Sequence, residues 1–270
     1  LFSDVELSYI SNNISLLSSH LLKNPTDMAL RKATSTTDGD LLLLVNSTDG
    51  SLATYSILRG QNVIAPSLST TDGTFEKVGV DVDQIYFVVK RTINSATKYY
   101  VECFNDDNTT DSSKLLSGGS KPSSTTVSGL SHLIGKTVKV VADDSMQNDK
   151  VVNGSGQITL DAVPTTYVEI GLDYTPEVKT LPVELKLSSG NITAQKKRII
   201  EATCNLYLSQ NLTLNGKDFL FTVGSGQFFT GKKRRKPMLG FDREGQMTFS
   251  QSSPLFFTLL GVEYKVSVGQ

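Results

Sequence analysis

Apolar residues occur in short runs that polar, turn-forming residues separate, and this pattern extends over most of the 270 residues. Such runs, bounded by Gly, Asp, Asn or Ser, are typical of antiparallel strands. From Val262 to Val268 every second residue is apolar, which predicts a strand with one solvated face. We expect strands at residues 28–33, 41–45, 52–58, 75–80, 85–91, 99–104, 137–142, 157–160, 167–170, 199–208, 212–214, 219–223, 246–250 and 255–268.

The turns between the first runs repeat one tripeptide. Thr-Asp-Gly occurs with its aspartates at Asp38, Asp49 and Asp72. Asp-Gly tolerates the positive φ angles of tight hairpins, so each copy between apolar runs is a turn signal. The repeat therefore predicts an antiparallel β-meander.

Residues 3–22 carry a different pattern, that of an amphipathic helix. Apolar residues recur there at helical spacing. Ser3 and Glu6 have the spacing of a capping box, and Pro25 would end the helix. A Ser-Asn-Asn sequence in the middle is poor helix material, so a break there would be compatible with the pattern.

Three regions follow from these patterns. Residues 1–126 form the β-meander with its helix and end in a Ser/Gly-rich loop or linker over 105–126, which holds almost nothing that a core could use. Residues 127–185 form a compact small β-barrel or sandwich module. Residues 186–270 form a C-terminal β region. Because this region resumes long strands, we infer that it shares a sheet with residues 1–104 and that the small module is an insertion.

Composition narrows the class of protein. The charged fraction of 20% and the hydrophobic fraction of 38% are typical of a globular protein. The longest uninterrupted apolar run, 41–45, is far shorter than the ~18 residues of a membrane helix, so we expect no membrane span. The chain opens with Leu1 and shows no signal-peptide pattern, so we expect an excised fragment. Cys103 and Cys204 are expected to be small buried side chains, and the sequence does not say whether they meet.

Few residues offer catalytic or metal-binding chemistry. The chain has only His20 and His132, far apart in sequence, so triads and zinc sites are disfavoured and both are expected to be ordinary polar residues. Acidic pairs stand at Asp81/Asp83, Asp106/Asp107 and Asp143/Asp144, and we interpret them as solvated turn acids. Acid/base glycoside chemistry stays as an alternative for these pairs, and Ca²⁺ binding as one for Asp106/Asp107 and Asp143/Asp144. We expect no catalysis, no cofactor and no metal.

Charge is distributed unevenly. The net charge is −1, but residues 1–185 hold 14 Lys/Arg against 22 Asp/Glu, whereas residues 186–236 hold 10 against 2. The densest run consists of Lys232, Lys233, Arg234, Arg235 and Lys236, with a smaller group at 196–198. Five consecutive cations cannot all be buried, so a solvated loop is predicted. Contact with DNA or with an acidic protein neighbour is the alternative.

Several passages resemble one protein family. The sequences "VSGLSHLIGKTVKVVADD", "GSGQITLD" and "VEIGLDYTPEVKTLPVE" resemble a module of the tail tubular (nozzle, or stabilisation) proteins of short-tailed bacteriophages. The resemblance extends to "QKKRIIEATCNLYLSQNLTLNG", to "QSSPLFFTLLGVEYKVSV" and to the Asp-Gly-rich passage near the start. Phe256, Pro66 and Asp144 depart from the family pattern, and the departures concern local turns.

The resemblance implies a fold and a role. It implies a propeller-like meander and a structural virion protein, made in the bacterial host cytoplasm. Copies, generally six, would form a ring of the tail tube, contact other phage tail proteins and conduct DNA, without sequence specificity, during ejection. The cationic run would then lie at a contact with another subunit or tail protein more than deep in the channel, where it would hold DNA. The alternative is a carbohydrate- or receptor-binding β module of a virion or cell-surface protein. A hydrolase fragment, testable at Asp106 or Asp143, is a third hypothesis.

Overall fold

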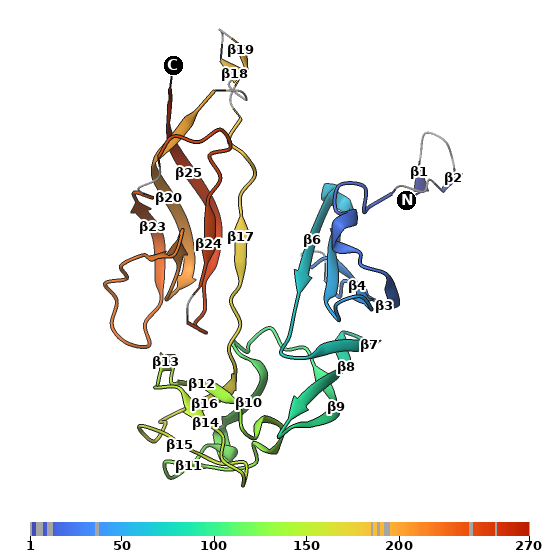
Figure 1. The fold of residues 1–270 in the computed structure, drawn as a ribbon, viewed down its shortest axis with the longest axis vertical. Coiled ribbons are helices and arrows are strands. Elements are labelled where there is room, and N and C mark those ends of the chain that lie inside the picture. Colours follow the sequence, from blue (N-terminus) through green and yellow to red (C-terminus); the bar gives the residue numbers. More distant parts are fainter. Residues whose placement is uncertain are drawn as a thin grey trace. The chain divides into compact units, whose positions relative to one another are not determined.

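The structure is a computed structural model of the chain, and it is mostly β (Figure 1). It describes residues 2–3, 8–9, 13–35, 38–184, 186–187, 190–191, 195–237, 240–251 and 253–269. Within these ranges the helical elements are single 3₁₀ turns: η1 (Ser19–Leu21), η2 (Arg59–Gln61), η3 (Gly118–Ser120) and η4 (Ser131–Leu133). The prediction of a mostly β fold with antiparallel meanders is confirmed.

The helix predicted over residues 3–22 is not formed in the part that the structure describes. Strands β1 (Phe2–Ser3) and β2 (Ser8–Tyr9) pair antiparallel instead, and residues 4–7 and 10–12 lie outside the described ranges. The Asn13 side chain accepts hydrogen bonds from the backbone N–H and the hydroxyl of Ser15. Such local bonds compete with helical hydrogen bonding, which explains why the apolar spacing did not produce a helix.

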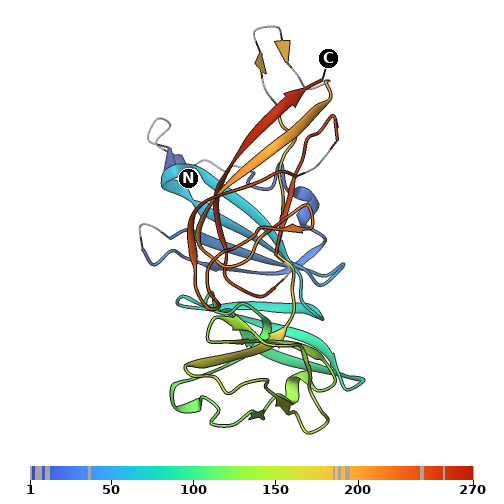
Figure 2. The ribbon, with the colours of Figure 1, turned by 90° about the vertical axis from the view of Figure 1, so that its left-hand side faces the viewer.

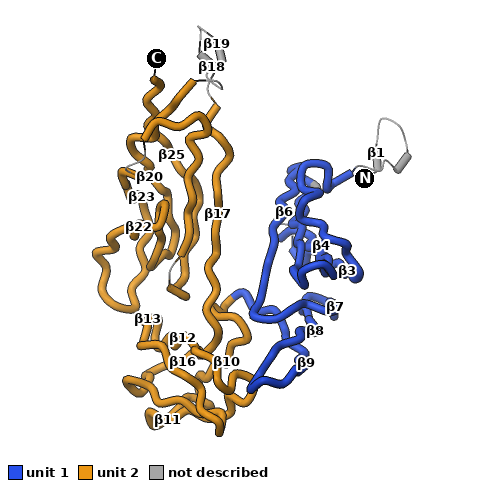
Figure 3. The backbone as a smooth tube through the Cα atoms, in the orientation of Figure 1, with its two compact units in different colours: residues 1–106 blue, residues 107–270 orange. Residues whose placement is uncertain are grey.

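The chain divides into two compact units, residues 1–106 and 107–270 (Figure 3). The first unit contains two antiparallel meanders, and each follows chain order. The four-stranded meander consists of β3 (Pro25–Arg31), β4 (Asp40–Asn46), β5 (Leu52–Leu58) and β6 (Val63–Ser69), and the three-stranded one of β7 (Thr74–Asp81), β8 (Gln84–Ile93) and β9 (Ala96–Cys103).

One face of the β3–β6 sheet packs on the β7–β9 meander. The contact is a cluster of buried aliphatic and aromatic side chains, and the Asp27 carboxylate accepts a hydrogen bond from the Val78 N–H at 3.1 Å. Alternation along each strand sends these residues to the same side of the sheet. The buried members of this cluster are Leu43, Val45, Leu52, Val78, Ile85, Phe87 and Val89.

The second unit begins with a module that has a core of its own, here called the middle module. Its main sheet has the order β10-β16-β12-β13, with β14 also paired to β12, and a small ladder joins β11 to β15. Among the described strands no closed barrel is formed. The strands are β10 (Asp111–Ser117), β11 (Thr126–Val127), β12 (Thr137–Ala142), β13 (Ser145–Met146), β14 (Lys150–Val151), β15 (Ile158–Thr159) and β16 (Tyr167–Leu172).

The stretch predicted as a linker, 105–126, contributes to this module. Strand β10 pairs with β16, and the backbone and hydroxyl groups of Thr109 and Thr110 bind the buried Glu169 carboxylate. Polar composition suggested a loop, but here polar side chains pair with a buried acid instead of joining the apolar core. The middle module therefore begins before residue 127.

The C-terminal region forms two further sheets. Strand β17 (Glu177–Lys179) lies in the range that the sequence assigned to the inserted module, but it pairs with β24 (Thr248–Ser250). This sheet continues through β21 (Thr213–Leu214) to β22 (Lys217–Asp218). The other sheet consists of β23 (Phe229–Arg235), β20 (Lys197–Ser209) and β25 (Thr258–Val268), in the order β23-β20-β25. Figure 2 shows its long strands β20 and β25 side by side. A short hairpin joins β18 (Lys186–Leu187) to β19 (Gly190–Asn191).

The predicted sheet shared between residues 1–104 and 186–270 is not formed. No sheet formed by the described residues contains strands from both of these regions. The inner sides of the C-terminal sheets enclose a separate apolar core, which includes Ile199, Leu206, Leu214 and Phe249. Long strands in both regions are explained by two separate cores.

Candidate functional site

Four of the five residues of the cationic run lie in a strand, not in the loop that the sequence predicts, and Lys236 follows directly after the strand. Strand β23 (Phe229–Arg235) pairs with β20, with Arg235 opposite Ala202 and Lys232 opposite Asn205. It forms one edge of the β23-β20-β25 sheet. Because side chains alternate along a strand, consecutive cations are divided between two faces and no longer have to share one solvated side.

Two of the five cations turn toward the inner face. Lys233 donates a hydrogen bond to the Leu220 carbonyl at 2.6 Å, and its Nζ lies 4.5 Å from the centroid of the Phe229 ring. Arg235 donates to the Asp218 carbonyl, and its guanidinium lies 6.0 Å from the Phe219 centroid. Each of these two cationic groups therefore has a carbonyl and an aromatic ring as partners within the fold. Lys233 and Arg235 therefore hold the segment that precedes β23 and are not a free surface.

The other three cations, Lys232, Arg234 and Lys236, are exposed. Lys232 forms an ion pair with Glu263 at 2.8 Å between two solvated side chains. Such exposed pairs contribute little to stability, and Lys232 lowers the pKa of Glu263. Among the residues that the structure describes, the side chains of Arg234 and Lys236 have no hydrogen-bond or ion-pair partner.

The smaller cationic group at 196–198 is divided in the same way. Lys197 is buried and donates to the Val183 carbonyl at 2.5 Å. Arg198 is exposed, and its strand position faces Ser267 of β25. The neighbouring Lys265, which the sequence did not single out, is also exposed and pairs in register with Glu201.

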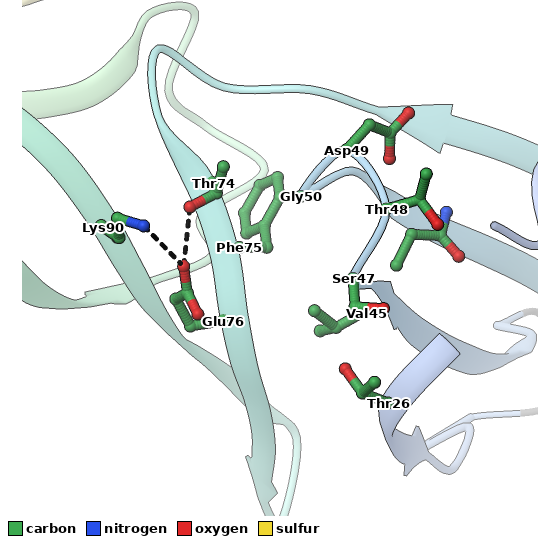
Figure 4. Close-up of a pocket in the computed structure, with 11 residues that line it drawn as sticks. Thr26, Val45, Ser47, Thr48, Asp49, Gly50, Thr74, Phe75, Glu76 and Lys90 are labelled. Atoms are coloured by element: carbon green, nitrogen blue, oxygen red, sulfur yellow. Dashed lines mark hydrogen bonds and ion pairs between the residues drawn. The ribbon is translucent and has the colours of Figure 1, made fainter. Parts of the chain in front are cut away.

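A second candidate site is an open pocket in the first unit (Figure 4). Its volume is about 520 Å³, within the usual range for ligand sites. The turn after β4, the start of β7 and Lys90 of β8 line it. In Figure 4, Glu76 lies between Thr74 and Lys90, with a 2.8 Å hydrogen bond from the Thr74 hydroxyl and a 3.9 Å ion pair to Lys90. Its remaining lining residues are Thr26, Val45, Asn46, Ser47, Thr48, Asp49, Gly50 and Phe75.

The polar groups of this pocket largely serve the turn itself. Asp49 accepts hydrogen bonds from Lys23 and from the N–H and hydroxyl of Ser51, and these bonds lower the pKa of its carboxyl to about 2. Gly50 has a φ of +66°, and a Cβ there would lie 2.3 Å from the Thr74 Cβ. The Asp-Gly sequence therefore closes the turn, and the close approach of β7 requires the glycine. Sequence reasoning identified the turn but not the pocket, which forms only where two meanders pack.

The remaining candidate residues are not brought together into a catalytic group. His20 is exposed on η1, and a ring nitrogen of His132 lies 3.2 Å from the Ser112 carbonyl. No group of three or more potential metal-binding side chains occurs in the described ranges. Two acidic pairs, Asp81/Asp83 and Asp106/Asp107, are exposed.

Asp143 has a structural use that its sequence context did not reveal. Its carboxylate accepts hydrogen bonds from the N–H and hydroxyl groups of both Thr165 and Thr166, at 2.7–2.8 Å. Burial raises the pKa of Asp143, but these bonds outweigh it, so the pKa lies well below its ordinary value. With both carboxylate oxygens occupied, Asp143 is poorly placed to act as a general acid or base.

The two cysteines have different environments, and neither forms a disulfide. Cys204 is fully buried, and burial raises the pKa of its thiol to about 11. Cys103 is exposed, so the expectation of two buried side chains is confirmed for Cys204 only. No helix in the described part of the chain has the length and apolar character needed to cross a membrane.

A scan against protein-family models finds none that matches this chain, and a search of curated proteins finds no relative.

Proposed function

We propose that this chain is a structural component of a phage tail tube, part of a nozzle ring that conducts DNA and performs no catalysis. The proposal rests on the sequence resemblance described above and on one structural observation. That observation is an apolar sheet face in the first unit whose rim is exposed to solvent. The proposed partners are further copies of the chain, in a ring of generally six, other tail proteins and the passing DNA.

The open face belongs to the β3–β6 sheet, on the side opposite the β7–β9 meander. Strand register aligns Met28, Leu44, Ala53 and Leu68 in one row across the four strands. The next two rows contain Leu30, Leu42, Tyr55 and Pro66, followed by Asp40, Ile57 and Ile64. All but one of these side chains are apolar, and we call this surface the outer face.

The rim of the outer face is exposed, and its centre is covered. Tyr55 and Ala53 are buried, and the Ser18 hydroxyl donates to the Tyr55 hydroxyl at 3.1 Å. Met28 is 70% exposed, and three other rim residues, Leu30, Ile64 and Leu68, are 38–44% exposed. Exposed apolar side chains gathered on one face of a sheet are typical of interaction sites in soluble proteins. Contact between neighbouring subunits at this rim would bury these apolar side chains and so favour assembly.

Strand β6 adds an unpaired edge to this surface. All seven of its residues are exposed, and in the sheet order it has a neighbour on one side only. Exposed edge strands invite pairing with another chain unless something blocks them, and Pro66 is one such block. This favours assembly through the apolar rim more than through strand addition at β6.

Electron microscopy tests this proposal. The account predicts closed rings, or arcs of rings, with a central hole wide enough for a DNA duplex when the protein is concentrated. Dispersed monomers at every concentration would contradict it.

The carbohydrate-binding alternative is favoured by a different observation, the pocket of Figure 4. Hydroxyl and carboxylate groups line this open space beside the Phe75 ring, a combination suited to a polar ligand. Saccharide binding that is lost in Glu76→Gln and retained in Asp83→Asn, an exposed acid outside the pocket, would favour this function over the structural one.

A further inference from the structure

We propose that the outward face of the β23-β20-β25 sheet binds the phosphate backbone of nucleic acid. The face carries five cations, Lys232, Arg234 and Lys236 from β23 and its end, Arg198 from β20 and Lys265 from β25. The inference does not depend on the proposed function, because it uses only the charges and register of this sheet.

Strand register places these side chains on one surface. Lys232 is opposite Asn205, and Arg234 is opposite Thr203, which in turn pairs with Glu263. Residues directly opposite one another in an antiparallel pair point to the same side of the sheet. Ala202, Cys204 and Leu206 alternate with these positions and are fully buried in the C-terminal core, so the other side faces inward.

Most of the positive charge on this face has no partner. In the described ranges, the side chains of Arg234, Lys236, Arg198 and Lys265 form no hydrogen bond or ion pair. Two acids, Glu201 and Glu263, share the surface, and only Glu263 pairs with a cation there. Five cations against two acids leave an excess of three positive charges on a chain whose net charge is −1.

Protection of the sheet edge does not account for this arrangement. Lysines on an edge strand do discourage pairing with other chains, and β23 is an edge strand. Arg198, however, lies on the central strand β20, and Lys265 lies on the opposite edge β25. Edge protection would not require cations on all three strands and on one face.

The spacing of the cations favours a periodic polyanion. Alternate residues of a strand are about 6.6–6.8 Å apart. Lys232, Arg234 and Lys236 therefore extend over about 13 Å, the axial length of about four phosphates on one strand of a duplex at ~3.4 Å each. Asn205 and Tyr207 are exposed on the same face and can donate to phosphate oxygens. The two acids should keep this binding weak, in the micromolar range of non-specific contacts.

Fluorescence anisotropy with a labelled single-stranded oligonucleotide tests the inference across salt concentrations. The variant Lys232→Gln/Arg234→Gln/Lys236→Gln should weaken binding at least 10-fold at low salt. It should also reduce the slope of log K against log[salt] by about 2, at ~0.7 per lost phosphate contact. The matched control Lys77→Gln/Lys98→Gln/Lys179→Gln removes the same charge from exposed positions on other sheets and should leave the slope unchanged.

A second variant separates binding from misfolding. Glu201→Gln/Glu263→Gln removes the acids from the face and should tighten binding by at least threefold, a gain that a damaged fold would not produce. Equal weakening by the triple variant and its control would overturn the inference, because net charge alone would then explain binding. Equal competition by poly-L-glutamate, charge for charge, would overturn it in favour of an acidic protein partner. Ring formation does not enter this assay, so its failure would leave the proposed function in place.

Discussion

The middle module and the β3–β6 sheet use similar alternating strands with different results. In the middle module twelve apolar residues converge on one core, and several of them, such as Leu133, Val140 and Ile170, have no exposed surface. In the β3–β6 sheet, one face is buried in the same way, but the outer face is also apolar across all four strands and its rim remains exposed. The middle module buries most of its apolar residues in its own core, whereas the β3–β6 sheet has more than its own unit covers.

The two regions therefore differ in whether their apolar side chains stabilise the fold of a single chain. Burial of a leucine or isoleucine side chain contributes about 1.5–3 kcal/mol to folding, and an exposed one contributes little until something covers it. Apolar residues at the rim of the outer face therefore add little to the stability of a single chain. Their contribution would appear on association.

The largest expected effect is a stability difference between matched leucines. Leu133→Ala, in the middle module, should lower the free energy of unfolding by about 2–5 kcal/mol, because it leaves a cavity at a fully buried position. Leu68→Ala, on the rim, should lower it by at most about 1 kcal/mol. Urea unfolding followed by circular dichroism measures both, since the chain has no tryptophan for fluorescence.

A larger stability loss in Leu68→Ala than in Leu133→Ala would contradict this difference between the two regions. A large loss for Leu68→Ala at protein concentrations where the chain is monomeric would mean that the rim is part of the core. The denaturation should also be followed by hydrogen exchange, because two units need not unfold together.

A smaller effect is expected from acid. The pKa of Asp143 is lowered in the folded state, so its hydrogen bonds stabilise the middle module above the unfolded pKa of ~3.9, and this stability is lost as pH falls below it. Asp49 has the same sign in the first unit, with a pKa of about 2. Melting temperature should therefore fall between about pH 4 and pH 2 in the wild type and fall less steeply in Asp143→Asn. An unchanged slope in Asp143→Asn would show that its bonds to Thr165 and Thr166 do not stabilise the fold.

Sequence periodicity predicted strands best where both ends carry turn residues. The predicted bounds match those of β5 and β12. An Asp-Gly turn precedes β5, and an Ala-Asp-Asp sequence spans the end of β12 and the turn that follows it. Strand β6 was not predicted. It contains Pro66, which is tolerated there because β6 is an edge strand. The segment 219–223 was predicted as a strand, but it instead lies against the inward cations of β23.

The candidate sites were predicted less completely than the strands. Counting charge located the cationic run, but only strand register could separate Lys233 and Arg235 from the exposed cations and add Lys265 to them. The pocket and the hydrogen bonds to the buried Glu169 carboxylate join residues that are distant in sequence. Thr109 and Glu169 are one such pair. No local pattern indicates such pairs, because they depend on which sheets pack and pair.

Sedimentation velocity over a range of protein concentrations tests the central claim, that the outer face is an assembly surface. The wild type should form oligomers, and Met28→Lys/Leu68→Lys should remain monomeric, because two lysines on the rim would have to be buried without partners. The control Val151→Lys/Leu181→Lys, at exposed apolar positions of the second unit, should assemble like the wild type. A wild type that stays monomeric, or a rim variant that assembles as well as the control, would contradict the account.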